Sequence, residues 1–267
     1  MPFYSIALNY DSSWQGDDEG PHNNRFIIIT PDRATSDLVF RVIQDNPRSL
    51  TSRISFQEVR RISPQMWSWS APGHNDYTAL EHTIVDINRG KVNCDQKHLE
   101  KLRGKVTLDY IGDWTKPLPI IPHLDAADHI SGNHFCIRNK RAPTQFWAYP
   151  WVSEGKPVTV STARRAKFRI RAIDGSVRNG ETLMVDTDMV SLELVFPDRG
   201  GTSYWPVTLD KTDGVLIPQR SGSSDTFTLG SLFLGGFSVD FFPKNLDKLY
   251  PFKIRDESER GELWELC

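Results

Sequence analysis

Charged and apolar residues alternate in Lys167-Phe-Arg-Ile-Arg-Ala-Ile173, with the period of two that a half-buried β-strand requires. The same alternation returns at 190–196 and 237–241, and turn-forming pairs such as Asn179-Gly180 separate the runs. Short strands punctuated this often by turns are typical of antiparallel sheets. We therefore expect a mainly β protein, an antiparallel barrel or sandwich with one or two short helices in the N-terminal half. We also interpret 228–234 as a packed strand.

The N-terminal part mixes strand and helix signals. Strands are predicted at 3–10, 25–29, 53–62 and 105–110. Helices are predicted at 37–44, after a Thr-Pro-Asp start, and at 95–103, before a glycine. The segment 75–87 fits a helix and a strand equally well. We expect a single β-rich domain over 1–267, and the alternative is a division into an α+β part (1–120) and an all-β part (121–267).

The composition excludes several classes of protein. The chain has 267 residues, of which 38% are hydrophobic and 25% charged, and this balance is typical of a folded protein. A net charge of −2 creates no overall field that would attract nucleic acid. No secretion signal or apolar run of membrane-spanning length is visible, and three cysteines without a CxxC pair favour a reducing compartment. We expect a cytoplasmic protein without a membrane partner, for which nucleic acid is an unlikely ligand and the oligomeric state stays open.

The common fingerprints of nucleotide and metal enzymes are absent. The sequence contains no GxxxxGK[ST] and no GxGxxG after a strand, which argues against a phosphate-binding loop. The GxSxG and HExxH motifs are missing as well. We therefore expect no cofactor and no metal.

A cluster of histidines and carboxylates is the first candidate for chemistry. It lies in His123-Leu-Asp-Ala-Ala-Asp-His129 and extends to His134. On a helical turn Asp125 and His129 would share a face, where a carboxylate can orient a histidine as a general base or the two can hold a metal. The alternative is an exposed polar loop. The candidate acid/base residues are Asp125, Asp128, His129 and His134.

Two aromatic segments are the second candidate. Met66-Trp-Ser-Trp69 is followed by His74 and Asp76, and the other segment is Phe146-Trp-Ala-Tyr-Pro-Trp151. Aromatic residues two positions apart line one face of an extended chain, so each set would form either a pocket wall or part of the core. The candidate ligand-binding residues are Trp67, Trp69, His74, Asp76, Trp147, Tyr149 and Trp151.

The third candidate is a basic stripe. It consists of Arg165, Lys167, Arg169 and Arg171, which alternate with apolar residues and would share one strand face. Such a row of cations can follow a polyanion, such as a phosphate backbone. We favour the other interpretation, a solvated outer face that protects the strand from pairing with other chains, because the overall charge is slightly negative.

The leading functional hypothesis is a β-barrel protein that binds a small organic molecule in an aromatic-lined pocket. A cofactor-independent isomerase, cyclase or lyase is the enzyme class that such a pocket would suit, with one His or Asp moving a proton. The first alternative is a cytoplasmic lectin with Asn75, Asp76 and Asp113 at the sugar hydroxyls. The second is a viral or structural β protein that binds a polyanion through the basic stripe.

Overall fold

Two compact units, Met1–Asp128 (unit 1) and His129–Cys267 (unit 2), make up the computed structural model of the chain. Their boundary falls close to the alternative division that the sequence suggested at residue 120. The structure describes residues 2–9, 24–47, 50, 55–70, 78–112, 121, 124, 126–151, 153–173, 181–198, 200–212, 214–240, 248–251 and 261–267. Within these ranges the protein is mainly β, as the alternating pattern predicted, and its sheets are largely antiparallel.

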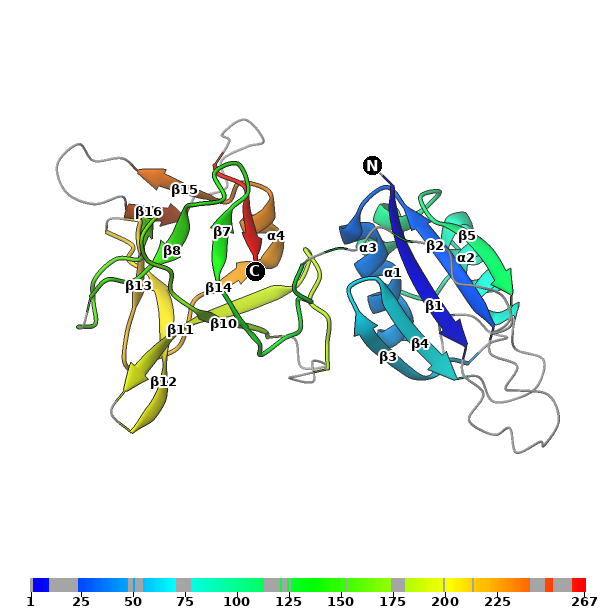
Figure 1. The fold of residues 1–267 in the computed structure, drawn as a ribbon, viewed down its shortest axis with the longest axis horizontal. Helices are drawn as coiled ribbons and strands as arrows, with labels where there is room; N and C mark the ends of the chain where they lie inside the picture. Colours follow the sequence, from blue (N-terminus) through cyan, green and yellow to red (C-terminus); the bar gives the residue numbers. More distant parts are fainter. Residues whose placement is uncertain are drawn as a thin grey trace. The chain divides into compact units, whose positions relative to one another are not determined.

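Unit 1 contains a five-stranded sheet with the order β3-β4-β1-β2-β5 (Figure 1). Its strands are β1 (Phe3–Asn9), β2 (Arg25–Thr30), β3 (Gln57–Ser63), β4 (Met66–Ser70) and β5 (Thr107–Gly112). β1 runs parallel to β4, and the other neighbouring pairs are antiparallel. The central strands β1 and β2 bury Ile6, Phe26 and Ile28, so the middle of the sheet carries much of the core.

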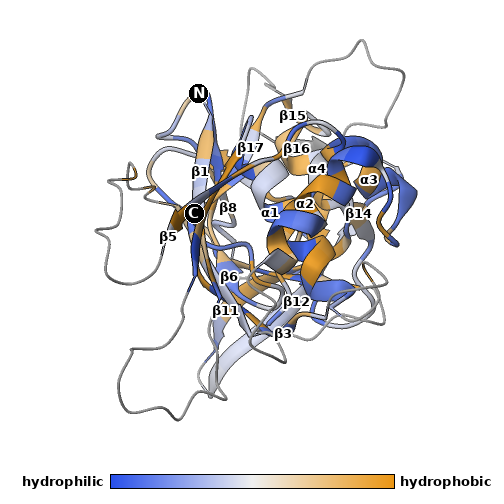
Figure 2. Cartoon of the chain, turned by 90° about the vertical axis from the view of Figure 1, so that its right-hand side faces the viewer, coloured by the Kyte–Doolittle hydropathy of each residue, from blue (hydrophilic) through white to orange (hydrophobic). Residues whose placement is uncertain are grey.

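Three helices cover one face of this sheet, where the sequence predicted one or two (Figures 1 and 2). They are α1 (Arg33–Asp45), α2 (Ala79–Arg89) and α3 (Gln96–Leu102). Asp32 caps α1, since its side chain accepts a hydrogen bond of 2.8 Å from the backbone N–H of Thr35. The ambiguous segment became α2, whose buried residues follow helical spacing and which ends at Gly90 in the left-handed conformation (φ 72°).

Aromatic side chains fill the space between the sheet and the helices of unit 1. The rings of Trp67 and Trp69 on β4 lie 5.4 Å apart. Phe40 from α1 meets Trp67 edge-on at 5.7 Å, and Phe56 meets Trp69 at 6.0 Å. These four rings are at most 1% exposed, so the predicted Trp-x-Trp face is the core of unit 1.

Unit 2 is built from two six-stranded sheets. The first has the order β13-β12-β11-β10-β6, with β14 paired to β11. Its strands are β6 (His134–Phe135), β10 (Phe168–Ala172), β11 (Met189–Asp198), β12 (Gly201–Leu209), β13 (Leu216–Pro218) and β14 (Thr226–Thr228). The second has the order β15-β16-β9-β8-β7-β17. Its strands are β7 (Ile137–Asn139), β8 (Phe146–Ala148), β9 (Thr159–Ser161), β15 (Phe237–Asp240), β16 (Lys248–Pro251) and β17 (Trp264–Leu266).

The two sheets of unit 2 pack through Trp147 on β8. Its ring meets Phe168 of the first sheet edge-on at 5.7 Å, and meets Phe237 and Trp264 of its own sheet at 5.4 and 5.7 Å. An isolated bridge joins Phe237 of the end strand β15 to Glu262, two residues before β17 at the other end of the sheet's order. Because this link is a single bridge and not a paired strand, unit 2 resembles a sandwich more than a closed barrel.

The predicted strand over 228–234 is wrong. Only 226–228 is a strand, β14, and it leads directly into the short helix α4 (Leu229–Phe233). Leu229 and Leu232 lie three positions apart and are both buried, as a helical turn requires. A Cβ atom on Gly230 would lie only 2.8 Å from the carbonyl oxygen of Asp186, so the close approach of this turn requires glycine.

Candidate ligand-binding site

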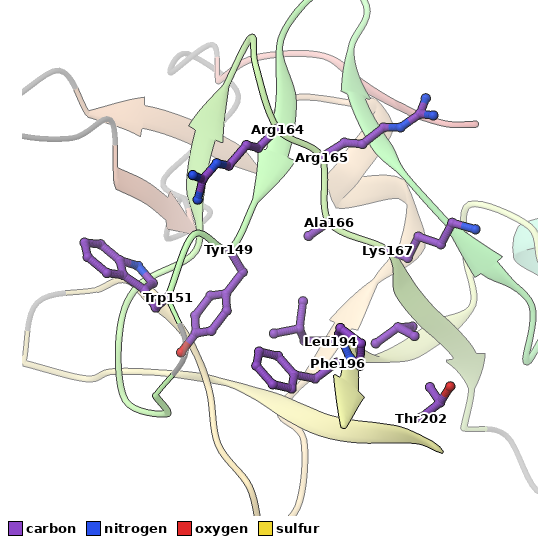
Figure 3. A pocket seen from close by; sticks show the side chains of 11 residues that line it. Tyr149, Trp151, Arg164, Arg165, Ala166, Lys167, Leu194, Phe196 and Thr202 are labelled. Carbon is purple, nitrogen blue, oxygen red and sulfur yellow. The ribbon is translucent and has the colours of Figure 1, made fainter. Parts of the chain in front are cut away.

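A cavity of about 600 Å³ opens at one side of unit 2 (Figure 3). It is lined by Tyr149 and Trp151 after β8, by the segment 164–167 before β10, and by 194–197 with Thr202 on the β11–β12 hairpin. Its volume falls in the range of about 300–1,000 Å³ that is typical of small-molecule sites. The pocket thus combines two predicted aromatic residues with two predicted cations, Arg165 and Lys167.

Hydrogen bonds and ring contacts hold the aromatic side of the pocket in place. The hydroxyl of Tyr149 donates to the carbonyl oxygen of Ser153 at 2.6 Å, and the indole N–H of Trp151 donates to that of Pro157 at 3.1 Å. Behind them the buried ring of Trp205 stacks on Phe196 at 4.2 Å. Because both polar groups are already bonded within the protein, Tyr149 and Trp151 offer their flat apolar faces.

Burial raises the pKa of the Tyr149 hydroxyl above its ordinary value of 10.0, and the nearby carboxylate of Glu154 adds to the shift. A backbone hydrogen bond from Lys156 opposes it. Tyr149 is therefore a neutral phenol at physiological pH. Its role in the pocket is that of a fixed ring and not of a proton carrier.

Three cations surround the opening of the pocket. Arg164, Arg165 and Lys167 are exposed, and none of them forms an ion pair with another residue that the structure describes. Arg164 reaches toward the side where Tyr149 and Trp151 lie, and the other two extend to the opposite side (Figure 3). No carboxylate is among the lining residues, so the rim is positively charged.

The predicted basic stripe divides into two halves. Arg169 and Arg171 lie on β10, and both are paired with Glu193 on β11, at 2.5 and 3.0 Å. Glu193 stands directly opposite Arg169 in the register, and the Arg169 guanidinium also covers the ring of Tyr204 at 3.5 Å from its centre. Arg169 and Arg171 are therefore engaged within the sheet, whereas Arg165 and Lys167 stand at the pocket.

The predicted aromatic residues are not gathered into one wall. Trp67 and Trp69 are buried in unit 1, and Trp147 is fully buried in unit 2. Only Tyr149 and Trp151 line the cavity. The remaining candidates, His74 and Asp76, lie outside the residues that the structure describes.

The described members of the predicted acid/base cluster lie outside the pocket lining. Asp128 belongs to unit 1, where it pairs with Arg61, whereas His129 belongs to unit 2 and stacks on Phe233 at 5.4 Å. His134 is exposed on β6, with its ring 5.7 Å from that of Tyr204. Asp125 lies outside the described residues. None of the three described members lines the pocket, and the described part of the chain holds no group of three or more His, Cys, Asp or Glu residues that could bind a metal.

Asp128 instead completes a buried ionic cluster in unit 1. Arg61 contacts Asp37 at 2.5 Å and Asp128 at 3.2 Å, and Arg33 contacts Asp37 at 3.1 Å. Arg33 also donates to the carbonyl oxygen of Ala127 at 2.7 Å. The Arg61 and Asp37 side chains are 4% and 6% exposed, so the cluster fastens the segment 127–128 to α1 and β3 from within.

Burial raises the pKa of Asp37 above its ordinary value of 3.8, and the attraction of Arg61 and Arg33 only partly offsets this effect. The folded protein therefore keeps the Asp37 proton at pH values where the unfolded chain has lost it. The stability that this group contributes is fully present below pH 3.8 and is lost as the pH rises through the folded pKa.

We expect the difference in unfolding free energy between the native protein and Asp37→Asn to decrease as the pH is raised from about 4 to about 8. Asparagine does not titrate, so the difference isolates the proton on Asp37. Urea unfolding of both proteins across this pH range measures it. A difference that grows with pH would show that the two arginines outweigh burial.

Within the described residues, no helix is both long and apolar enough to cross a bilayer. The chain matches no protein-family model and no curated protein. The candidate site is therefore defined by its own geometry.

Proposed function

We propose that unit 2 binds a small organic molecule that combines a planar ring with a negative charge. One observation carries the proposal: the pocket places an aromatic side, Tyr149 and Trp151, beside three cations without a carboxylate among the lining residues. Ring stacking on aromatic side chains contributes about 1–3 kcal/mol in other proteins. Hydrogen bonds to charged groups contribute about 1.5–3 kcal/mol.

The charge of the rim favours an anion over a neutral sugar. Lectin-like recognition uses aromatic faces with hydrogen-bonding groups, and it gains little from three cations that form no ion pair with another described residue. The residues proposed for sugar hydroxyls, Asn75, Asp76 and Asp113, lie outside the described residues. An aromatic carboxylate, sulfonate or phosphate uses both halves of this pocket.

The proposal is for binding and not for turnover. The candidate acid/base residues Asp128, His129 and His134 do not line the cavity, and a general base has to be within hydrogen-bond reach of the proton that it takes. Isomerase, cyclase or lyase chemistry would therefore need a proton-transfer group other than these three residues.

The proposal is tested with pairs of aromatic anions and their neutral counterparts, such as benzoate with benzamide and naphthalene sulfonate with naphthalene sulfonamide. We expect ligand-detected NMR to show binding of the anions, with the neutral partners at least about tenfold weaker, a difference of about 1.4 kcal/mol. Binding should also weaken as salt is added. Neutral partners that bind equally well would contradict the role of the cations.

Lys167→Glu is expected to weaken binding of the anions about tenfold or more, because it puts a repulsive charge at the rim. Trp151→Ala is expected to weaken the anions and their neutral partners alike, since it removes a stacking face. The matched control is Lys140→Glu, which makes the same charge change at an exposed position that does not line the pocket. If Lys140→Glu had the same effect as Lys167→Glu, general charge and not the pocket would explain binding.

A longer polyanion is the second candidate for the same rim. Arg164, Arg165 and Lys167 lie within four consecutive residues and are exposed, as a phosphate backbone would require. Affinity that rises steeply from a single nucleotide to an oligonucleotide would favour this ligand. Affinity that is independent of length would favour the small molecule.

A further inference from the structure

Two of the three cysteines lie opposite each other in the second sheet of unit 2. β17 pairs with β7 in the register Leu266 to Ile137, so the next pair along is Cys267 with Cys136. The backbone N–H of Cys136 donates to the carbonyl oxygen of Cys267 at 2.8 Å, and the reciprocal bond measures 3.0 Å. The two cysteines therefore form a hydrogen-bonded antiparallel pair.

This geometry brings the two cysteines close enough for a cross-strand disulfide, with a small approach of the two strands. The Cα atoms of such a pair are typically about 5.5 Å apart, within the range of about 4.4–6.8 Å found across disulfides. Directly opposed side chains also project from the same face of a sheet. The sulfur of Cys267 already lies 3.6 Å from the carbonyl oxygen of Cys136, and both thiols are free.

The two thiols differ in access. Cys267 is exposed and Cys136 is 7% exposed, so a reagent in solution reaches Cys267 first. Partial burial of its sulfur raises the pKa of Cys267, and the neighbouring Cys136 and Glu265 add to this effect, whereas the cations Arg138 and Arg165 partly offset it. Because the thiolate is the reacting form, exchange at Cys267 should become faster as the pH rises.

We propose that Cys136 and Cys267 form a disulfide when the protein meets a low-molecular-weight disulfide such as oxidised glutathione. The Cys267 thiolate attacks one sulfur of oxidised glutathione, and the first glutathione leaves as a thiolate. The Cys136 thiolate then attacks the Cys267 sulfur of this mixed disulfide and displaces the second glutathione. The two protein protons end on the two reduced glutathione molecules, so the exchange is balanced.

The disulfide would lock β17 onto β7. Their pairing spans three register pairs, and Trp264 of β17 packs against Trp147 in the core. A covalent link between residues 136 and 267 closes a loop of about 130 residues, which restricts the unfolded chain strongly. We expect the melting temperature to rise by roughly 5 °C or more on oxidation and to return on reduction.

The test is to incubate the full chain with oxidised glutathione, map its peptides by mass spectrometry and record thermal unfolding. The expected product links Cys136 to Cys267, leaves Cys94 reduced, forms faster at higher pH and forms unchanged in Cys94→Ser. Cys267→Ser changes an exposed side chain only and should abolish the link without loss of folding. Three outcomes would overturn the proposal. They are a glutathione that stays on Cys267, a disulfide that involves Cys94, and an unchanged melting temperature. The cysteine pair is separate from the pocket lining, so this result and the ligand-binding result stand independently.

Discussion

Trp147→Ala is expected to lower the free energy of unfolding of unit 2 by about 3–5 kcal/mol. Trp147 is completely buried, and its ring meets Phe168, Phe237 and Trp264 edge-on from both sheets. Alanine would leave a cavity at the point where the sheets join, with little scope for the surroundings to collapse. Urea unfolding followed by circular dichroism measures the loss.

The matched control is Trp151→Ala, in the same aromatic segment. Trp151 is only half-buried at the pocket, so we expect this change to cost clearly less stability and to act on ligand binding instead. Together the two variants separate a core residue from a ligand-facing one. Equal losses of stability would mean that Trp151 belongs to the core as well.

Asp37→Ala is expected to destabilise unit 1 by about 3–5 kcal/mol, because it leaves a buried cation without its nearest partner. The side chain of Arg61 is 4% exposed and touches Asp37 at 2.5 Å. Its Nη1 atom already has no hydrogen-bond partner among the described residues, so the site has no spare acceptor to offer. Chemical unfolding of the two proteins at neutral pH measures the difference.

Asp109→Ala is the control for this prediction. Asp109 lies on β5 of the same unit, and its side chain is exposed. Loss of an exposed carboxylate is expected to change stability by about 0.5 kcal/mol at most. If Asp37→Ala cost no more than Asp109→Ala, the ionic cluster would contribute nothing to the fold.

Local signals predicted two helices, α1 and α3, and the strands β1, β2, β3, β5, β10, β11 and β15. The alternation at 167–173 predicted β10, and the Thr-Pro-Asp start predicted α1. The segment of α2 was ambiguous because its β-branched residues Thr83, Ile84, Val85 and Ile87 favour strands locally. In the structure the segment is a helix whose buried residues face the sheet. The prediction of a strand over 228–234 was wrong because the close approach of Gly230 to Asp186 depends on the tertiary structure. The local sequence pattern does not indicate it.

The pocket could be predicted only in pieces. Tyr149 and Trp151 belonged to one hypothesis, and Arg165 and Lys167 belonged to another. The tertiary fold places the segments 149–151 and 164–167 side by side, and a local sequence pattern does not show this proximity. Arg164 and Phe196 were missed, although Arg164 directly precedes a predicted cation. Trp147 and Tyr149 share the predicted spacing but differ in burial, because β8 ends at Ala148.

The contacts of Arg33 and Arg61 with Ala127 and Asp128 also determine how much of the chain unit 1 needs for its buried ionic cluster to have no net charge. Two arginines face two aspartates, so the cluster is neutral only when Asp128 is present. A fragment cut at residue 120 would leave an excess positive charge in its interior, whereas one that extends through Asp128 would carry its own counterion. Unit 1 therefore extends eight residues beyond residue 120, the boundary of the alternative division that the sequence suggested.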